Sequence, residues 1–146
     1  MRKYRYRIDR EGGLWHEGTE VRDPNVIAFF LRGLQRTEDG RLVVKAAGEE
    51  NEVQADDIPY VVRMVEFQGE SVWLQFAGGF REILDPETLH WGEPETLYAR
   101  VRKGAFEARF TRNALVKLSE RFVRTDDGHA LNLGDKVYPI QGKAER

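Results

Sequence analysis

Histidine and serine are the side chains from which this chain could build a metal site or a nucleophile. The three histidines, His16, His90 and His129, show no i, i+4 pair and no HExxH spacing. The two serines, Ser71 and Ser119, stand outside any Gly-x-Ser-x-Gly elbow. The absence of cysteine excludes disulfides, thiolate metal sites and cysteine nucleophiles. The sequence therefore predicts no catalytic residue, no metal site and no cofactor.

Acidic residues gather at 48–52 and 55–57, where paired carboxylates could serve as acid and base. Adjacent acids in a polar loop are usually only solvated. Asp57, which precedes Ile-Pro-Tyr, is typical of a residue that caps neighbouring backbone amides. A small enzyme that uses carboxylate and histidine acid–base chemistry, with Asp57 and His16, stays open as the alternative function.

The sequence also suggests a pocket for a small ligand. The segments that carry them are expected to meet near one hairpin end, and the candidate binding residues are Trp15, His16, Arg22, Asp57 and Tyr60. Aromatic walls with a charged anchor are typical of such pockets. We expect a non-enzymatic binding or regulatory module that recognises a small anionic ligand or a protein partner, with Arg22 as the anchor and Trp15 and Tyr60 as walls.

Composition limits the possible partners. The chain has 146 residues, with 23 Lys and Arg against 25 Asp and Glu, a net charge of −2. This balance gives no global field that attracts nucleic acid. Near the start, Tyr4 and Tyr6 alternate with Arg5 and Arg7, which predicts tyrosines against a core and arginines in solvent instead of a base-stacking platform. Without a signal-peptide pattern or a long apolar run, we expect a cytoplasmic protein that does not enter a membrane.

A phrase that occurs twice defines the expected architecture. RTEDGRL at 36–42 returns as RTDDGHA at 124–130, and the longer segments 23–40 and 111–128 align without a gap. Apolar residues in both follow the i, i+3, i+7 spacing of an amphipathic helix: Ile27, Phe30 and Leu34 in the first, and Leu115, Leu118 and Phe122 in the second. Each segment is predicted to be a short helix whose exit turns into a strand.

Local signals support these helices and the strands around them. Asp23 and Thr111 are residue types favoured at a helix N-cap. Alternating apolar and charged residues upstream of each helix predict a hairpin, and Gly78-Gly79 predicts another between 71–77 and 80–84. We expect an α+β fold with mainly antiparallel sheets.

The order of these elements predicts two structurally repeated β-rich halves, each reading strand, strand, helix, strand. They cover residues 1–67 and 68–146 and are expected to pack as one compact unit. The sequence leaves the oligomeric state open.

The first half resembles the bacterial DUF1285 family of unknown function, most strongly over residues 4–67. Shared features are a glycine turn before tryptophan, an arginine before the helix, an aromatic residue within it, an Asp-Gly exit and an acidic residue before Asp-x-Pro-aromatic. The matching positions here are Gly13, Trp15, Arg22, Phe29 or Phe30, Gly40, Asp57, Pro59 and Tyr60. The resemblance implies a bacterial, non-membrane protein with two repeated halves and a place in signal transduction, and it carries over no catalytic residue.

Overall fold

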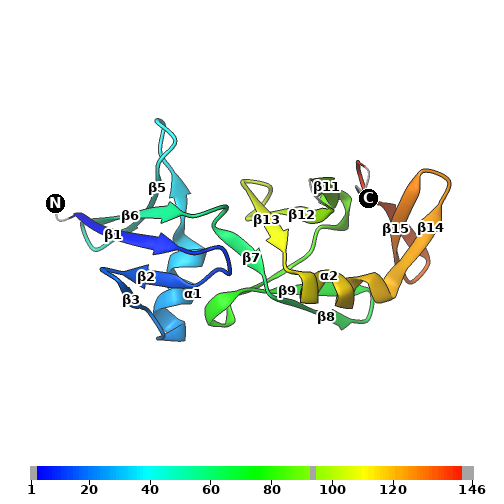
Figure 1. Cartoon of the computed structure of the whole chain (residues 1–146), viewed down its shortest axis with the longest axis horizontal. Helices are drawn as coiled ribbons and strands as arrows, with labels where there is room; N and C mark the ends of the chain where they lie inside the picture. Colours follow the sequence, from blue (N-terminus) through cyan, green and yellow to red (C-terminus); the bar gives the residue numbers. More distant parts are fainter. Residues whose placement is uncertain (1–2, 93–94, 143–146) are drawn as a thin grey trace. The chain divides into compact units, whose positions relative to one another are not determined.

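The computed structural model describes residues 3–92 and 95–142. Its contacts divide the chain into two compact units. The first comprises the described residues up to Pro59 together with Ala77–Phe80, and the second comprises Tyr60–Phe76 and the described residues from Arg81 onward. The boundary predicted after residue 67 therefore falls inside the second unit. Figure 1 shows the strands and helices of both units along the chain.

The first unit is built on one six-stranded sheet with the strand order β3-β2-β1-β6-β5-β4. Its pairs are antiparallel except for β1 and β6, which run parallel. The elements of this unit are β1 Lys3–Ile8, β2 Leu14–His16, β3 Thr19–Glu20, α1 Pro24–Gly33, β4 Gln35–Arg36, β5 Leu42–Ala46, β6 Glu49–Ala55 and the 3-10 turn η1 Ala77–Gly79.

The two faces of this sheet follow the alternation in β1. The Tyr6 ring lies 4.4 Å from Phe30 of α1, between ring centroids, and the same distance from His16, on which it stacks. Arg5 and Arg7 are exposed. Side chains two residues apart share a face of a strand, so the tyrosines line the helix-covered face and the arginines the open one. This confirms the arrangement predicted for the start of the chain.

Helix α1 begins where the sequence predicted. The amide of Asn25 donates to the carboxylate of Asp23 over 2.9 Å, and Pro24 occupies the first turn, where its missing N–H is not needed. Phe30 and Leu34 of the predicted stripe are buried. The η1 turn packs on this helix, where a Cβ atom on Gly78 would lie 2.5 Å from Cβ of Ile27.

The second unit contains three small sheets, with the orders β10-β9-β8, β11-β12-β13-β7 and β14-β15-β16. Their pairs are antiparallel except for β7 with β13. The strands are β7 Tyr60–Val62, β8 Met64–Gln68, β9 Ser71–Gln75, β10 Arg81–Ile83, β11 His90–Gly92, β12 Thr96–Val101, β13 Phe106–Phe110, β14 Phe122–Thr125, β15 Gly128–Leu133 and β16 Lys136–Pro139. The helical elements are α2 Arg112–Leu118 and the 3-10 turns η2 Pro86–Thr88 and η3 Ser119–Arg121.

Helix α2 is also capped as predicted, because the amide of Ala114 donates to the hydroxyl of Thr111 over 3.2 Å. The repeated phrase, however, is not a helix exit that turns directly into a strand. A short strand follows each helix, β4 in one case and β14 in the other, and the Asp-Gly pair lies at the hairpin turn to the next strand. Asp39-Gly40 is in the loop itself, whereas Asp127 is in the loop and Gly128 begins β15. The sequence correctly predicts a turn at each Asp-Gly pair. It does not predict β4 and β14, because strands of two and four residues are too short to give a recognisable alternation.

The α+β class with mainly antiparallel sheets is confirmed. Both helices are preceded by an antiparallel hairpin and followed by one. The strands that follow differ in their pairing: β5 and β6 join the sheet of β1, whereas β14, β15 and β16 form a sheet of their own. The hairpin predicted around Gly78-Gly79 is present as the β9–β10 pair, with η1 in its loop.

Candidate functional site

Trp15 is held by the loop of its own hairpin. Its indole Nε1 donates to a carboxylate oxygen of Asp9 over 2.7 Å, and the amides of Glu11 and Gly13 donate to the other oxygen over 2.9 Å each. The Arg7 guanidinium lies 5.4 Å from the centre of the indole. The ring is half-buried, and its polar group is already satisfied.

Asp9→Asn is expected to destabilise the protein by about 1 kcal/mol, since an amide group cannot accept all three bonds. Partial burial raises the pKa of Asp9. The hydrogen bonds from Trp15, Gly13 and Glu11 together lower it by more, so the pKa of Asp9 lies below its usual value. The charged form therefore stabilises the fold above the unfolded pKa, near 4, and this contribution disappears as the pH falls through the folded pKa. Denaturant unfolding of both proteins from pH 2 to 7 should show their difference shrinking below about pH 4. A constant difference would contradict this role.

His16 and Arg22 have local partners as well. Nδ1 of His16 lies 3.0 Å from the carbonyl oxygen of Arg5. Arg22 is 84% exposed at its side chain and pairs with Glu20 over 3.2 Å. In the register of β1 and β2, His16 is opposite Tyr6 and Trp15 opposite Arg7, so Trp15 and His16 point to opposite faces of the sheet.

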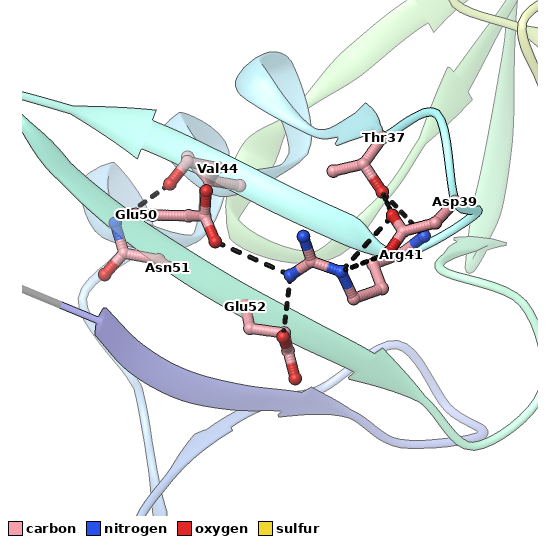
Figure 2. A network of polar contacts seen from close by, with 7 residues as sticks. All are labelled: Thr37, Asp39, Arg41, Val44, Glu50, Asn51 and Glu52. Atoms are coloured by element: carbon pink, nitrogen blue, oxygen red, sulfur yellow. Dashed lines mark hydrogen bonds and ion pairs between the residues drawn. The ribbon is translucent and has the colours of Figure 1, made fainter.

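Asp57 lines a first-unit cavity of about 360 Å³, which also includes Arg36 and Arg41. His16 is not among its lining residues, and the structure does not bring the two members of the acid–base alternative together there. Figure 2 shows the Arg41 guanidinium directed at Asp39 on one side and at Glu50 and Glu52 on the other, at 3.2, 3.5 and 3.0 Å. Bonds to Glu52 and Asp39 raise the pKa of Arg41. This exposed cation is already paired with carboxylates of the protein.

Tyr60 lies in the second unit and is fully buried. Its ring packs against Phe76 and Phe106, and its hydroxyl accepts a hydrogen bond from Nη1 of Arg102 over 2.6 Å. Burial raises the pKa of Tyr60 to about 12. No part of the ring is accessible to a ligand, so its place here is the core.

A larger cavity of about 770 Å³ lies within the second unit, and we call it the second-unit cavity. Three segments build it: the β9–β10 pair, the η2 loop and the turn between β12 and β13. Its lining residues are Trp73, Glu82, Ile83, Asp85, Thr88, Arg100, Arg102, Lys103 and Gly104. The volume is in the range of small-ligand sites.

The β12–β13 turn has unusual backbone geometry. The amide of Gly104 donates to the carbonyl of Val101 over 3.1 Å, and both residues between them, Arg102 and Lys103, have positive φ, at 54° and 58°. Asparagine and glycine are the usual residues of such a turn, because other side chains are strained there. Strain of this kind gathers at functional sites.

Arg102 anchors this turn, whereas two other cations, Arg100 and Lys103, line the cavity. The backbone amide of Arg102 donates to Glu82 over 2.9 Å, in addition to the bond from its side chain to Tyr60. Nε of Arg100 donates to the carbonyl of Gly104 over 2.8 Å, which orients its guanidinium. Within residues 3–92 and 95–142, neither Arg100 nor Lys103 has an ion pair with a carboxylate. The second-unit cavity therefore offers positive charge to an anion.

Lys103→Gly is expected to stabilise the protein by about 0.5–1 kcal/mol, because relief of the left-handed conformation exceeds the added freedom of the unfolded chain. Lys103→Gln is the matched control, since it removes the charge and keeps the strain, and it should leave the free energy of unfolding within about 0.5 kcal/mol. Chemical denaturation of the three proteins measures both effects. Equal stability of all three would mean that the turn is not strained.

Sequence reasoning missed Trp73, Arg100 and Lys103 as binding candidates. One signal was present: Arg-Lys-Gly, residues 102–104, puts long cationic side chains where a turn favours Asn-Gly.

Two further features of the described residues bear on function. No group of three or more metal-binding side chains lies together among them. None of the helices in these ranges is long and apolar enough to cross a membrane. The cytoplasmic location stays a prediction.

Solved structures identify the fold. A DUF1285 family protein from Silicibacter pomeroyi DSS-3 matches over 93% of this chain and 79% of its own, with a TM-score of 0.69 and 22% identity. A DUF1285 family protein from Shewanella baltica OS155 matches over 73% and 84%, with a TM-score of 0.59 and 18% identity. No protein family model matches the sequence, and no curated protein does. The resemblance to DUF1285 proteins is thus shown, and it establishes the fold.

Proposed function

We propose that this protein is a non-enzymatic binding module that recognises a small anionic ligand in the second-unit cavity. The observation that supports it most is a pair of cations, Arg100 near the end of β12 and Lys103 in the strained turn that follows, which line the same cavity as the half-buried Trp73. Among the described residues, neither cation has a carboxylate partner. A guanidinium and an ammonium group bind phosphate or carboxylate through charge-assisted hydrogen bonds. A regulatory role in bacterial signal transduction, which the family resemblance implies, would use this binding as its input.

The second-unit cavity differs from the site predicted from the sequence in the partners of its cations. Arg22 is highly exposed and paired with Glu20, and the arginine of the Figure 2 network is surrounded by acids. Arg100 and Lys103 are exposed as well, so the difference lies in the partners: carboxylates of the protein already pair with Arg22 and Arg41 and compete with an anion there. The cations of the second-unit cavity are favoured because the end of β12 and the turn after it position them at a concave surface.

Calorimetric titration of the purified protein with inorganic phosphate, pyrophosphate and citrate tests the proposal. At least one anion should bind, and Arg100→Gln should weaken it about tenfold, a loss of about 1.4 kcal/mol. Lys103→Gln should act in the same direction. Arg22→Gln is the matched control and should change nothing.

Two outcomes would contradict the proposal. If none of the three anions binds, the protein is not an anion receptor, and a protein partner becomes the better candidate. If Arg22→Gln abolishes binding and Arg100→Gln does not, the anion is bound at the site predicted from sequence.

We also infer that the two helix-and-hairpin segments are a structural repeat. The inference rests on their 88-residue register, the N-caps Asp23 and Thr111, and the hairpin after each helix. The different pairing of the last strands would then be a later divergence.

A further inference from the structure

We propose that the ligand of the second-unit cavity is a nucleoside monophosphate, with its base against Trp73 and its phosphate between Arg100 and Lys103. This inference rests on the proposed function and adds the chemical class of the ligand. Three kinds of lining residue carry it: an aromatic side chain, two cations, and two carboxylates.

The aromatic side chain is fixed before any ligand arrives. The Arg81 guanidinium lies 4.3 Å from the centre of the Trp73 indole, and Glu66 holds Arg81 over 3.4 Å. The cross-strand neighbour of Trp73 is Ile83, which lines the same cavity and is 50% exposed. A half-buried indole beside an exposed apolar side chain favours a flat aromatic ring, because every base has a π-face that stacks on it.

The two cations suit a phosphate group. Arg100 is oriented through its Nε bond to Gly104, which leaves its terminal nitrogens to donate, and Lys103 supplies a second positive charge. The backbone of Arg100 is fixed as well, because its amide donates to the hydroxyl of Thr88 over 3.0 Å. Two cations match the double negative charge of a phosphate monoester.

The carboxylates Asp85 and Glu82 limit the ligand further. Both oxygens of Glu82 lie within reach of the Arg102 amide, at 3.2 and 2.9 Å. In the described part of the chain, Asp85 accepts one side-chain hydrogen bond, from the amide of Glu87 over 3.2 Å, and so it can accept another. A carboxylate in an anion site repels additional phosphates but binds hydroxyl donors, as a ribose provides. Base, sugar hydroxyls and one phosphate together define a nucleoside monophosphate.

Calorimetric titration with four kinds of probe tests this assignment. They are the nucleoside monophosphates, adenosine, ribose 5-phosphate and inorganic phosphate. At least one nucleoside monophosphate should bind about tenfold more tightly than ribose 5-phosphate, since stacking of the base is lost in the sugar phosphate. Adenosine should bind more weakly than its monophosphate by about the same factor.

Substitution of Trp73 distinguishes stacking from mere structural damage. Trp73→Leu should remove the advantage of the nucleotide over ribose 5-phosphate and leave inorganic phosphate binding unchanged. Trp73→Phe should restore the advantage to within about threefold, because a second aromatic ring can stack. In the wild type, the nucleotide should also quench tryptophan fluorescence, and Trp73→Phe should lose most of this quenching while it still binds. Melting temperatures of both variants establish that they are folded.

The outcomes separate this inference from the proposed function. If phosphate and ribose 5-phosphate bind through Arg100 but no nucleotide binds more tightly than the sugar phosphate, the nucleotide assignment is wrong and the anion site stands. The same conclusion follows if Trp73→Leu keeps the full nucleotide advantage. If citrate binds but no phosphate compound does, the nucleotide assignment is wrong and the anion site stands. If neither citrate nor any phosphate compound binds, both proposals are wrong.

Discussion

Gly78→Ala is expected to destabilise the protein by about 3 kcal/mol, and to lower its melting temperature by roughly 10 °C. Gly78 has φ of +67°, and an added Cβ would lie 2.5 Å from Cβ of Ile27 and 3.0 Å from the carbonyl oxygen of Pro24. The Pro24 carbonyl belongs to the backbone of α1 and cannot move aside without disturbing the helix. Overpacking and left-handed strain therefore act together.

Gly79→Ala is the matched control for this prediction. Gly79 follows directly, has a similar φ of +74°, and an added Cβ there would meet nothing within 4 Å. Only the strain remains, so about 1 kcal/mol is expected. Thermal and urea unfolding of both variants measures the difference. If the two substitutions destabilise equally, η1 does not pack on α1 as described.

Tyr60→Phe is expected to destabilise the protein by about 2 kcal/mol at pH 8, because it takes from Arg102 the hydroxyl that accepts its hydrogen bond. Arg102 anchors the turn that carries Lys103, so anion binding should weaken in this variant too. Tyr138→Phe, in β16 of the same unit, serves as the control and should have an effect within about 0.5 kcal/mol. Urea unfolding and calorimetry measure the two effects. Unchanged stability and affinity would mean that this hydrogen bond does not hold the turn.

The same tyrosine predicts a defined response to alkali. Burial raises the pKa of this phenol from its usual 10.0 to about 12 in the folded protein. The folded state therefore keeps the phenol proton in a range where the unfolded chain loses it. The stabilisation is complete below pH 10 and is lost as the pH rises from about 10 to about 12. Phenylalanine does not titrate, so the stability difference between wild type and Tyr60→Phe should shrink across this window. A difference that widens there would contradict the burial of a neutral phenol.

Features with short-range causes were predictable from the sequence. The N-caps Asp23 and Thr111 bond to amides two and three residues away. The alternation of Tyr4 to Arg7 fixed which face of β1 is buried, because the side-chain period of a strand is two. The Asp-Gly loops were correct for the same reason, since turn chemistry depends on a few adjacent residues.

The binding cavity depends on long-range pairing that a single sequence does not reveal. Trp73 reaches it through the register of β9 with β10, and Arg100 through the hairpin of β12 with β13. The sequence also does not show which arginine lines a cavity. Arg22 follows a strand and Arg100 lies in one, and only the fold places Arg100 at the second-unit cavity. Tyr60 is predicted from the sequence as a pocket wall because aromatic walls are typical of small-ligand pockets, but the strand β7 that it begins is buried throughout.

The most direct test of the central claim is a nuclear magnetic resonance titration of the isotope-labelled protein with inorganic phosphate. The account predicts that the largest shifts occur at the Arg100 Nε–H and at the backbone amides of Lys103 and Gly104, while the Trp15 indole and the Arg22 Nε–H stay unchanged. Shifts centred on Trp15, Arg22 and Asp57, with none at Arg100, would contradict it and place the anion in the first unit.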